Sequence, residues 1–147
     1  MTLVYGTGDF SVEELYGFLT ECDTQFSPLL SSRVNLIKYS EKLILNSILF
    51  HARENNKTVG IMAFYANDTR LDYAFISLIC VWKGYERKGI GSKFIDDCIS
   101  IVKKKGIKSI RLEVDIENQD AISFYAGIGF HIENTHTQSY IMVKIIH

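Results

Sequence analysis

The chain has 147 residues, of which 47% are hydrophobic and 22% charged, with ten glycines and one proline. This length fits one domain of ordinary size, which buries enough surface to fold without a disulfide or a structural metal. The composition excludes a disordered or low-complexity protein. The formal net charge of −1 gives no basic footprint, so we expect neither nucleic acid nor an anionic membrane surface as a partner.

The cysteines and histidines show no pattern of a metal site or a disulfide framework. Cys22, Cys80 and Cys98 are an odd number without a C-x-x-C pair, and we interpret them as small buried residues in a reducing compartment. The four histidines lack the spacing of a zinc site, so we expect no metal. No apolar run approaches about 18 residues, and the first residues lack a signal sequence, which predicts a cytoplasmic protein.

Residues 1–46 are predicted to form mainly a helical hairpin. A capping box at Ser11–Glu14 begins the first helix. A turn is expected over Phe26–Leu30, because the residue before a proline avoids the helical conformation. Helical spacing of apolar residues then resumes from Val34 to Asn46.

The middle of the chain changes to the pattern of β-strands. Two β-rich runs, Ser47–Arg53 and Thr58–Tyr65, flank the hairpin loop Glu54–Lys57. A second turn is predicted at Asn67–Arg70. Asp72–Trp82 is an unbroken aromatic and β-branched run, which favours a strand buried on both faces.

The remaining chain predicts a strand–helix–strand unit followed by a short helix and a last strand. A polar, glycine-rich turn at Lys83–Ser92 leads into a helix that ends at Gly106, where a run of lysines forms a solvated terminus. The strand Lys108–Ile116, the helix Asn118–Gly127 and the strand Ser139–Ile146 follow. The first two strands of this unit should form a right-handed parallel pair. The architecture is therefore α/β, with a mixed, mostly antiparallel sheet.

The turn after the buried strand has the features of an anion site. Amide N–H groups at a helix N-terminus have no acceptor within the helix, and the helix dipole places partial positive charge there. Gly89 and Gly91 let a ligand approach the main chain, and Arg87 and Lys88 add positive charge. A phosphate or pyrophosphate is the expected ligand.

Two nucleotide-binding motifs do not fit this turn. Gly84 and Gly89 have P-loop spacing, but Ile90 and Gly91 stand where the P-loop needs Lys and Ser or Thr. A dinucleotide fingerprint would need a third glycine at Phe94, and the preceding chain is not a βαβ unit. Neither nucleotide hydrolysis nor dinucleotide binding is expected.

Two motifs resemble those of the GNAT superfamily of N-acetyltransferases. Glu86-Arg87-Lys88-Gly89-Ile90-Gly91 resembles the family's acetyl-CoA loop, Gln/Arg-x-x-Gly-x-Gly/Ala, although Glu86 stands where Gln or Arg is usual. Residues Asn118–Phe130 look like the family signature Asn-x-x-Ala-Ile-x-Phe-Tyr-x-x-x-Gly-Phe. The resemblance covers residues 58–130 and is weak over the first 45 residues.

The resemblance implies one GNAT-like α+β domain over residues 1–147, with one splayed parallel strand pair and about four helices. Residues 1–46 would be its substrate-side hairpin and residues 58–130 its acetyl-CoA-binding core. Acetyl-CoA is the implied co-substrate, with its pantetheine arm pairing like an added strand. The implied cofactor-binding residues are Ile79, Cys80, Val81, Arg87, Lys88, Gly89, Ile90, Gly91, Ser92, Asn118 and Tyr125.

The same resemblance implies direct attack of a primary amine on the thioester in a ternary complex, with a strand N–H as oxyanion donor. Tyr125 would protonate the leaving thiolate, which suits a phenol; the alternative interpretation is a core aromatic. Glu113 is the candidate base; a surface carboxylate, another residue or a water relay stays open. Asn118 would bind the CoA arm, cap its helix, or do both.

The acceptor is not defined by the sequence. The helical hairpin and the last strand would wall its pocket, and a small-molecule amine and a protein N-terminus both stay open. A homodimer is compatible with the sequence. The alternative function is a non-catalytic acyl-CoA-binding sensor or interaction module, which the departure at Glu86 and the unsettled base favour.

Overall fold

The computed structural model describes residues 2–26, 28–70 and 72–147. These residues form seven strands, four α-helices and two 3₁₀ turns, which confirms the expected mixed architecture. Ser27, in the turn expected at Phe26–Leu30, lies outside the described residues. By contacts the chain divides into two compact units, residues 1–64 with 78–95 and residues 65–77 with 96–147. Strand β4 and helix α3 each have residues in both units.

The strands form one sheet in the order β1-β2-β3-β4-β5-β7-β6. The ladder between β4 and β5 is parallel, and the ladders of β1 with β2, β2 with β3, β5 with β7 and β6 with β7 are antiparallel. The strands are β1 (Val4–Thr7), β2 (Ile48–Glu54), β3 (Lys57–Tyr65), β4 (Ala74–Val81), β5 (Ser109–Asp115), β6 (His131–Thr135) and β7 (Ser139–Ile145). The helices are α1 (Val12–Cys22), α2 (Leu36–Asn46), α3 (Ile90–Lys104) and α4 (Gln119–Gly127), and the 3₁₀ turns are η1 (Asp23–Gln25) and η2 (Leu30–Ser32).

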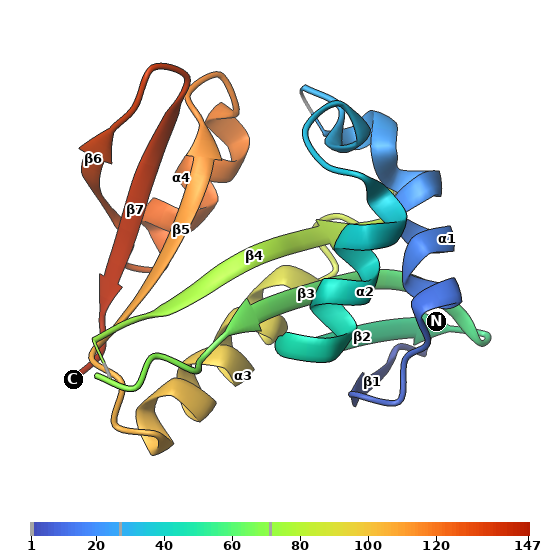
Figure 1. The fold of residues 1–147 in the computed structure, drawn as a ribbon, viewed down its shortest axis with the longest axis horizontal. Coiled ribbons are helices and arrows are strands. Elements are labelled where there is room, and N and C mark those ends of the chain that lie inside the picture. Colours follow the sequence, from blue (N-terminus) through green and yellow to red (C-terminus); the bar gives the residue numbers. More distant parts are fainter. Residues whose placement is uncertain (1, 27, 71) are drawn as a thin grey trace. The chain divides into compact units, whose positions relative to one another are not determined.

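The predicted local signals of the first unit are present. The Ser11 hydroxyl accepts the N–H of Glu14 at 3.0 Å, and the Glu14 carboxylate accepts the N–H of Ser11, which completes the capping box of α1. Asn55 and Asn56 both have positive φ, the backbone of a type I′ turn, so β2 and β3 form the expected hairpin. Figure 1 shows α1 and α2 side by side next to this hairpin.

The two faces of β2 and β3 pack against different partners. Phe50 stacks on Phe94 of α3, and Gly60 lies so close to Phe94 and Ile90 that a Cβ there would come within 2.9 Å of Ile90. On the opposite face His51 stacks on Phe10, just before α1. The start of α3 is therefore fixed against the sheet by core packing, which places the turn before it.

The parallel pairing of β4 with β5 is short. It covers Ala74↔Ile110, Phe75↔Arg111 and Ile76↔Leu112, whereas β5 pairs with β7 along its whole length, Ser109–Asp115. The expectation that β4 is buried on both faces is corrected, because burial alternates along the strand. The face of Ile76 is buried, and the face of Phe75 keeps partial contact with solvent.

Two strands were not expected from the sequence, β1 and β6. Strand β1 pairs with β2, and β6 pairs with β7, so each lies at an edge of the sheet. All five residues of β6 are exposed. In the described part of the chain, no helix has the length and apolar character needed to cross a membrane.

Candidate active site

The glycine-rich segment after β4 forms a tight turn that leads directly into α3. The N–H of Tyr85 donates to the carbonyl of Trp82 at 2.9 Å. Gly84, Arg87 and Gly89 all have positive φ, at 97°, 63° and 80°. Two of the three are glycines, which adopt this conformation without the cost that a side chain brings. Glycine therefore stands at two of the three positions of the turn where the backbone favours it.

The turn presents main-chain amides next to open space. Helix α3 begins at Ile90, and its first hydrogen bond from this region runs from Lys93 N–H to the Gly89 carbonyl at 3.0 Å. By helix geometry the N–H groups of the first turn have no acceptor within the helix. A Cβ built on Gly89 meets nothing within 4 Å. These features fit an anionic ligand such as a diphosphate at residues 87–92.

Glu86, which departs from the family pattern, is turned back onto this loop. Its carboxylate accepts the N–H of Gly84 at 2.8 Å. Hydrogen bonds from its own N–H and from that of Gly84 lower the pKa of the Glu86 carboxyl, so it stays ionised. Glu86 therefore organises the start of the turn and adds negative charge there.

The turn is also tied to the β2–β3 hairpin. The Tyr85 hydroxyl donates to the Glu54 carboxylate at 2.5 Å, and this hydrogen bond raises the pKa of the Tyr85 phenol. The Lys57 ammonium lies 5.2 Å from the centre of the Trp82 ring. The loop of this hairpin was predicted only as a connection. Its first and last residues, Glu54 and Lys57, contact the two ends of the segment Trp82–Tyr85.

The end of β4 contains the three predicted contacts of the pantetheine arm. Cys80 is buried, and Ile79 and Val81 are half-buried. A hydrogen bond with Cys22 and burial raise the pKa of the Cys80 thiol, so this residue stays neutral, as expected for a small core residue. Gln25, which the sequence did not single out, donates a hydrogen bond to the carbonyl of Val81.

In the second unit, Asn118 is the N-cap of α4 and Tyr125 lies near the end of this helix. The Asn118 side chain accepts the N–H of Ala121 at 3.2 Å, so it caps the helix, as one of its two interpretations required. The Tyr125 ring packs edge-on against Phe124 and Phe130. Tyr125 is only 7% exposed, and burial raises the pKa of its phenol. Its hydroxyl therefore stays protonated at neutral pH.

Glu113 lies on the exposed face of β5. Its carboxylate accepts a hydrogen bond of 2.5 Å from the Ser139 hydroxyl of β7. The neighbouring Arg111 lies over the Tyr73 ring and 3.4 Å from the Glu133 carboxylate. Glu113 thus has a defined partner, and Ser139 was not predicted from the sequence.

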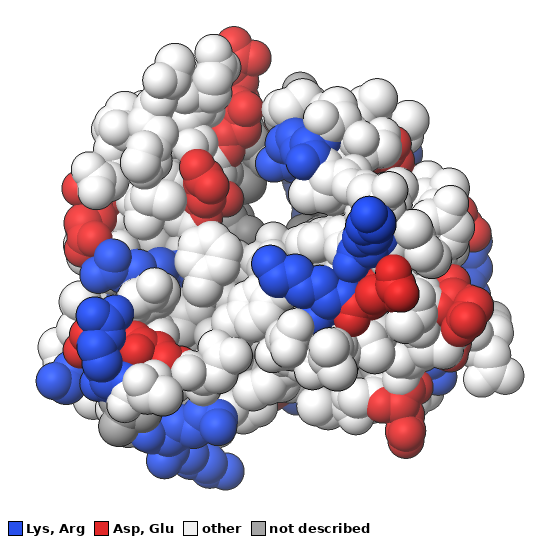
Figure 2. Space-filling model, in the orientation of Figure 1, with Lys and Arg blue, Asp and Glu red and all other residues white. Residues whose placement is uncertain are grey.

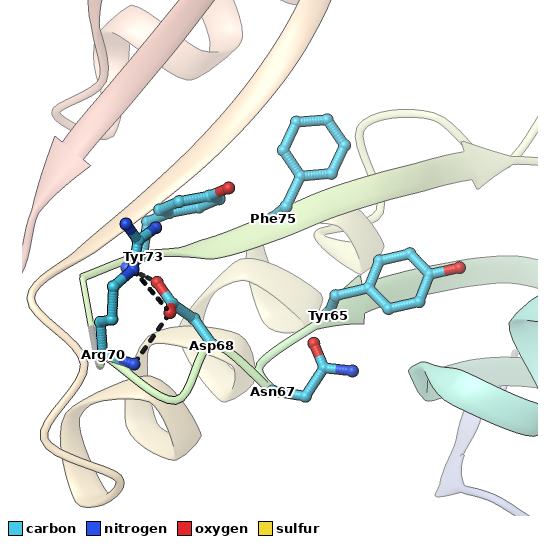
Figure 3. Close-up of a pocket in the computed structure, with 6 residues that line it drawn as sticks. All are labelled: Tyr65, Asn67, Asp68, Arg70, Tyr73 and Phe75. Atoms are coloured by element: carbon cyan, nitrogen blue, oxygen red, sulfur yellow. Dashed lines mark hydrogen bonds and ion pairs between the residues drawn. The ribbon is translucent and has the colours of Figure 1, made fainter.

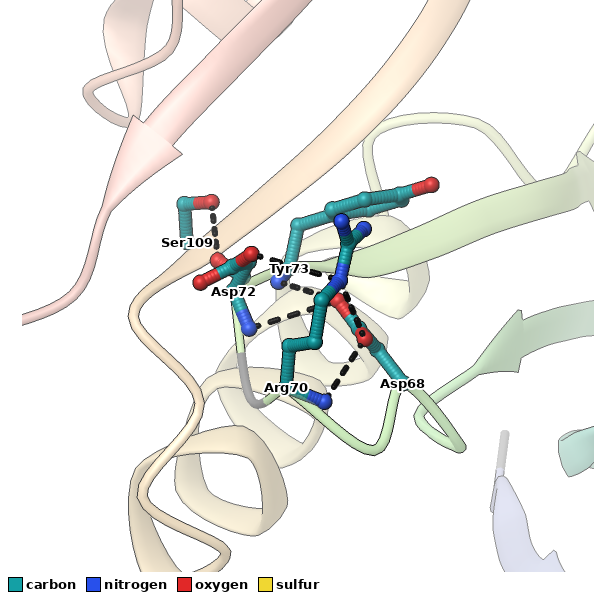
Figure 4. Close-up of polar contacts among 5 residues, drawn as sticks. All are labelled: Asp68, Arg70, Asp72, Tyr73 and Ser109. Atoms are coloured by element: carbon teal, nitrogen blue, oxygen red, sulfur yellow. Dashed lines mark hydrogen bonds and ion pairs between the residues drawn. The ribbon is translucent and has the colours of Figure 1, made fainter.

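A pocket of about 370 Å³ lies where β3 connects to β4 (Figure 3). Its lining residues are Tyr65, Asn67, Asp68, Arg70, Tyr73 and Phe75. The Asp68 carboxylate accepts main-chain N–H groups of Arg70, Asp72 and Tyr73 (Figure 4), and the bond from Arg70 is the main reason that the pKa of Asp68 is lowered. Asp68 therefore builds the predicted turn, which sets the start of β4.

The start of β5 is joined to the same turn. The Ser109 hydroxyl donates to the Asp72 carbonyl at 2.9 Å, just before the parallel ladder begins at Ala74 and Ile110. Figure 4 shows this bond beside the ion pairs that Arg70 makes with Asp68 and Asp72. The polar groups of this region therefore serve the turn and the strand pairing.

Charges of both signs are mixed on the molecular surface. Among the described residues on the face drawn in Figure 2, both Lys and Arg and Asp and Glu side chains are seen. Within the described ranges, no group of three or more His, Cys, Asp and Glu residues is arranged to hold a metal ion.

The mixed sheet, its single parallel pair and the glycine turn at the start of α3 define an acetyltransferase-type fold. The family model "Acetyltransferase (GNAT) family" matches residues 12–130, and the chain belongs to this family. The family identifies the chain as an N-acetyltransferase, which confirms the expected fold and enzyme class.

Similar proteins agree with this assignment. A spermidine N(1)-acetyltransferase of Thermoplasma acidophilum is 29% identical over 116 residues, which are 73% of this chain and 71% of that protein. A ribosomal protein bS18-alanine N-acetyltransferase of Escherichia coli is 28% identical over 107 residues, 69% of this chain and 70% of that protein. The crystal structure of the PaiA N-acetyltransferase of Thermoplasma acidophilum in complex with coenzyme A superposes with a TM-score of 0.78 at 21% identity, and 99% of each chain is covered.

Proposed function

We propose that this protein transfers the acetyl group of acetyl-CoA to a primary amine by direct attack in a ternary complex. The observation that carries the proposal is the turn at residues 87–92, where main-chain amides and a glycine with positive φ border open space at the start of α3. This turn would bind the diphosphate through Arg87, Lys88, Gly89, Ile90, Gly91 and Ser92. The main chain at Ile79–Val81 would pair with the pantetheine arm.

Tyr125 is proposed as the general acid. Its phenol is buried against Phe124 and Phe130, and burial keeps it protonated at neutral pH. A protonated phenol supplies a proton to a leaving thiolate and takes part in no competing ion pair. Asn118, which caps α4, would hold the strand-to-helix connection that carries this residue.

Glu113 is proposed as the base that removes a proton from the acceptor amine. Its carboxylate is exposed and ionisable, and the Ser139 hydroxyl fixes one of its oxygens. An exposed carboxylate needs no rearrangement to reach an amine from solvent. The alternative is a water relay that removes the proton. Substitution of Glu113 distinguishes the two, because a water relay does not need this carboxylate.

The acceptor belongs to one of two classes. Relatives of similar length act on spermidine and on an alanine of ribosomal protein bS18, as their names state. We propose a primary amine as acceptor, offered either by a small molecule or by a protein N-terminus. The net charge of −1 suits a cationic amine of either kind.

The test is an acetyltransfer assay that titrates the free thiol released from acetyl-CoA. The panel should contain spermidine, amino sugars, amino acids and peptides with a free N-terminal alanine. We expect thiol release above background with at least one amine. CoA binding without turnover across the panel would establish the alternative, a non-catalytic acyl-CoA-binding module. No CoA binding by calorimetry would contradict both.

A further inference from the structure

The side chain of Gln25 bonds to the main chain at the end of β4. Its Nε2 donates to the Val81 carbonyl at 2.8 Å, and the N–H of Lys83 donates to its Oε1 at 2.9 Å. In a parallel ladder, one residue donates its N–H to the carbonyl of one residue of the neighbouring strand. Its carbonyl accepts the N–H of the residue two positions further along that strand. The carboxamide of Gln25 therefore takes the place of one residue of an added parallel strand.

These bonds lie on the side of β4 that faces away from β3. The N–H of Trp82 donates to the Val59 carbonyl of β3 at 2.7 Å. Because successive strand residues direct their main-chain groups to opposite sides, the groups of Val81 point away from β3, as do those of Ile79. Gln25 thus pairs with the same edge on which we place the pantetheine arm.

The short turn that carries Gln25 is held in place by its own contacts. The Asp23 carboxylate accepts the N–H of Ser31 at 2.8 Å and the hydroxyl of Ser31 at 2.5 Å, and these bonds lower the pKa of Asp23. The N–H of Phe26 donates to the Asp23 carbonyl. The carboxylate bonds join Asp23, two residues before Gln25, to Ser31 of η2, so the residues next to Gln25 are held where it reaches β4.

We propose that Gln25 sets the register of the pantetheine arm on β4. Its carboxamide fills the position formed by the Val81 carbonyl and the Lys83 N–H. The preceding position, formed by the Ile79 carbonyl and the Val81 N–H, is left for an amide of the arm. Equivalent positions on a strand are about 6.6 Å apart, so a slip by one position would carry the thioester away from the reacting amine. This inference rests on the proposed function and makes Gln25 a positioning residue.

The test is the substitution Gln25→Met, which removes both hydrogen bonds and keeps the length of the side chain. Misplacement of a reacting group by about 1 Å lowers rates up to about a hundredfold, so we expect kcat to fall about tenfold to a hundredfold. CoA affinity by calorimetry should change less than about threefold, because the diphosphate contacts are untouched. The melting temperature of the free protein should stay within about 2 °C, since water replaces exposed hydrogen bonds between neutral groups.

Two further variants complete the experiment. Gln25→Glu keeps an acceptor for Lys83 N–H but places a carboxylate oxygen against the Val81 carbonyl, so its kcat should also fall below that of wild type. Thr24→Ala, at an exposed position of the same turn, is the matched control and should behave as wild type.

The outcomes separate this inference from the proposed function. A wild-type protein without CoA binding or acetyltransfer contradicts the proposed function itself. An active wild type with an equally active Gln25→Met variant overturns only the register role. A variant with a lowered melting temperature, and with kcat and CoA affinity reduced together, also overturns it, because that pattern describes a structural residue.

Discussion

The carboxylate of Glu86 lies 2.8 Å from the main-chain nitrogen of Gly84 and accepts its hydrogen bond. An ionised acid therefore lies in the same turn whose amides we propose to hold a diphosphate. Its hydrogen bonds explain how the turn forms without the Gln or Arg that is usual at this position. Its charge should nevertheless weaken the attraction between the turn and an anion.

We expect Glu86→Gln to bind CoA about two- to threefold more tightly, which is the order of the interaction between two like charges several ångströms apart in water. The amide oxygen of the glutamine retains the bond from Gly84, so the turn should keep its shape. Calorimetry at low and high salt checks this, because the gain should shrink as salt screens the charge. Glu41→Gln on α2 removes the same charge elsewhere and should leave affinity unchanged; equal gains in both variants would refute the local effect.

Gly89→Ala, compared with a second glycine variant, should distinguish the effect of backbone strain on stability from the effect of a blocked ligand site on CoA affinity. At φ of 80° an alanine strains the backbone by about 1–2 kcal/mol, while its Cβ meets open space and clashes with nothing in the protein. If that space receives the diphosphate, CoA affinity should fall at least about tenfold. Gly8→Ala, also at positive φ with open space, should lose similar stability and keep its CoA affinity. Equal CoA affinities for the two variants would place the ligand elsewhere.

The elements that were predicted best from the sequence have either a long periodic pattern or residues typical of a cap or a turn. The capping box at Ser11–Glu14 and the asparagines of the β2–β3 turn form by local interactions, so their residues identify them. Strands β1 and β6 were missed because they lie at the sheet edges. β6 buries no side chain and so shows no alternation, and β1 has four residues, one of them Gly6.

The residues of the candidate site also fall into those that the sequence reveals and those that it does not. Gly84 and Gly89 are visible in the sequence because a positive φ favours glycine. Gln25 is an exposed polar residue whose partner is 56 positions away, and Ser139 lies 26 positions from Glu113. Contacts of this kind depend on tertiary structure and leave no local pattern.

His51 should make stability fall in mild acid. It is buried against Phe10, its Nε2 bonds to the Gly8 carbonyl, and burial together with Arg53 lowers the pKa of the folded imidazole. As pH falls below about 6.5 the unfolded chain takes up a proton that the folded His51 does not, so unfolding becomes easier. Urea midpoints at pH 8, 6.5 and 5 measure this. His51→Phe should flatten the slope, whereas His131→Gln on exposed β6 should keep it; identical slopes in all three proteins would exclude His51.

Tyr125→Phe should lower kcat about a hundredfold, the usual range for loss of a general acid, and leave CoA affinity within about threefold. Because burial raises the pKa of Tyr125 above its usual value near 10, its deprotonation should cause no loss of wild-type kcat below about pH 10. Tyr73→Phe, a half-buried tyrosine after the turn between β3 and β4, is the matched control and should keep wild-type kcat. Wild-type turnover by Tyr125→Phe would remove this hydroxyl from the mechanism and leave the ring as a core residue.

Glu113→Gln should lower kcat/KM about a hundredfold at neutral pH if its carboxylate takes the proton of the acceptor amine. CoA affinity should not change, because Glu113 is not placed at the cofactor. Ser139→Ala removes the hydroxyl that holds the carboxylate but keeps its charge, so the loss should be about threefold. The two losses of kcat/KM should be compared. If Glu113 is the base and Ser139 only holds it, Glu113→Gln must lose more than Ser139→Ala. Unchanged kcat/KM in Glu113→Gln would transfer proton removal to a water relay.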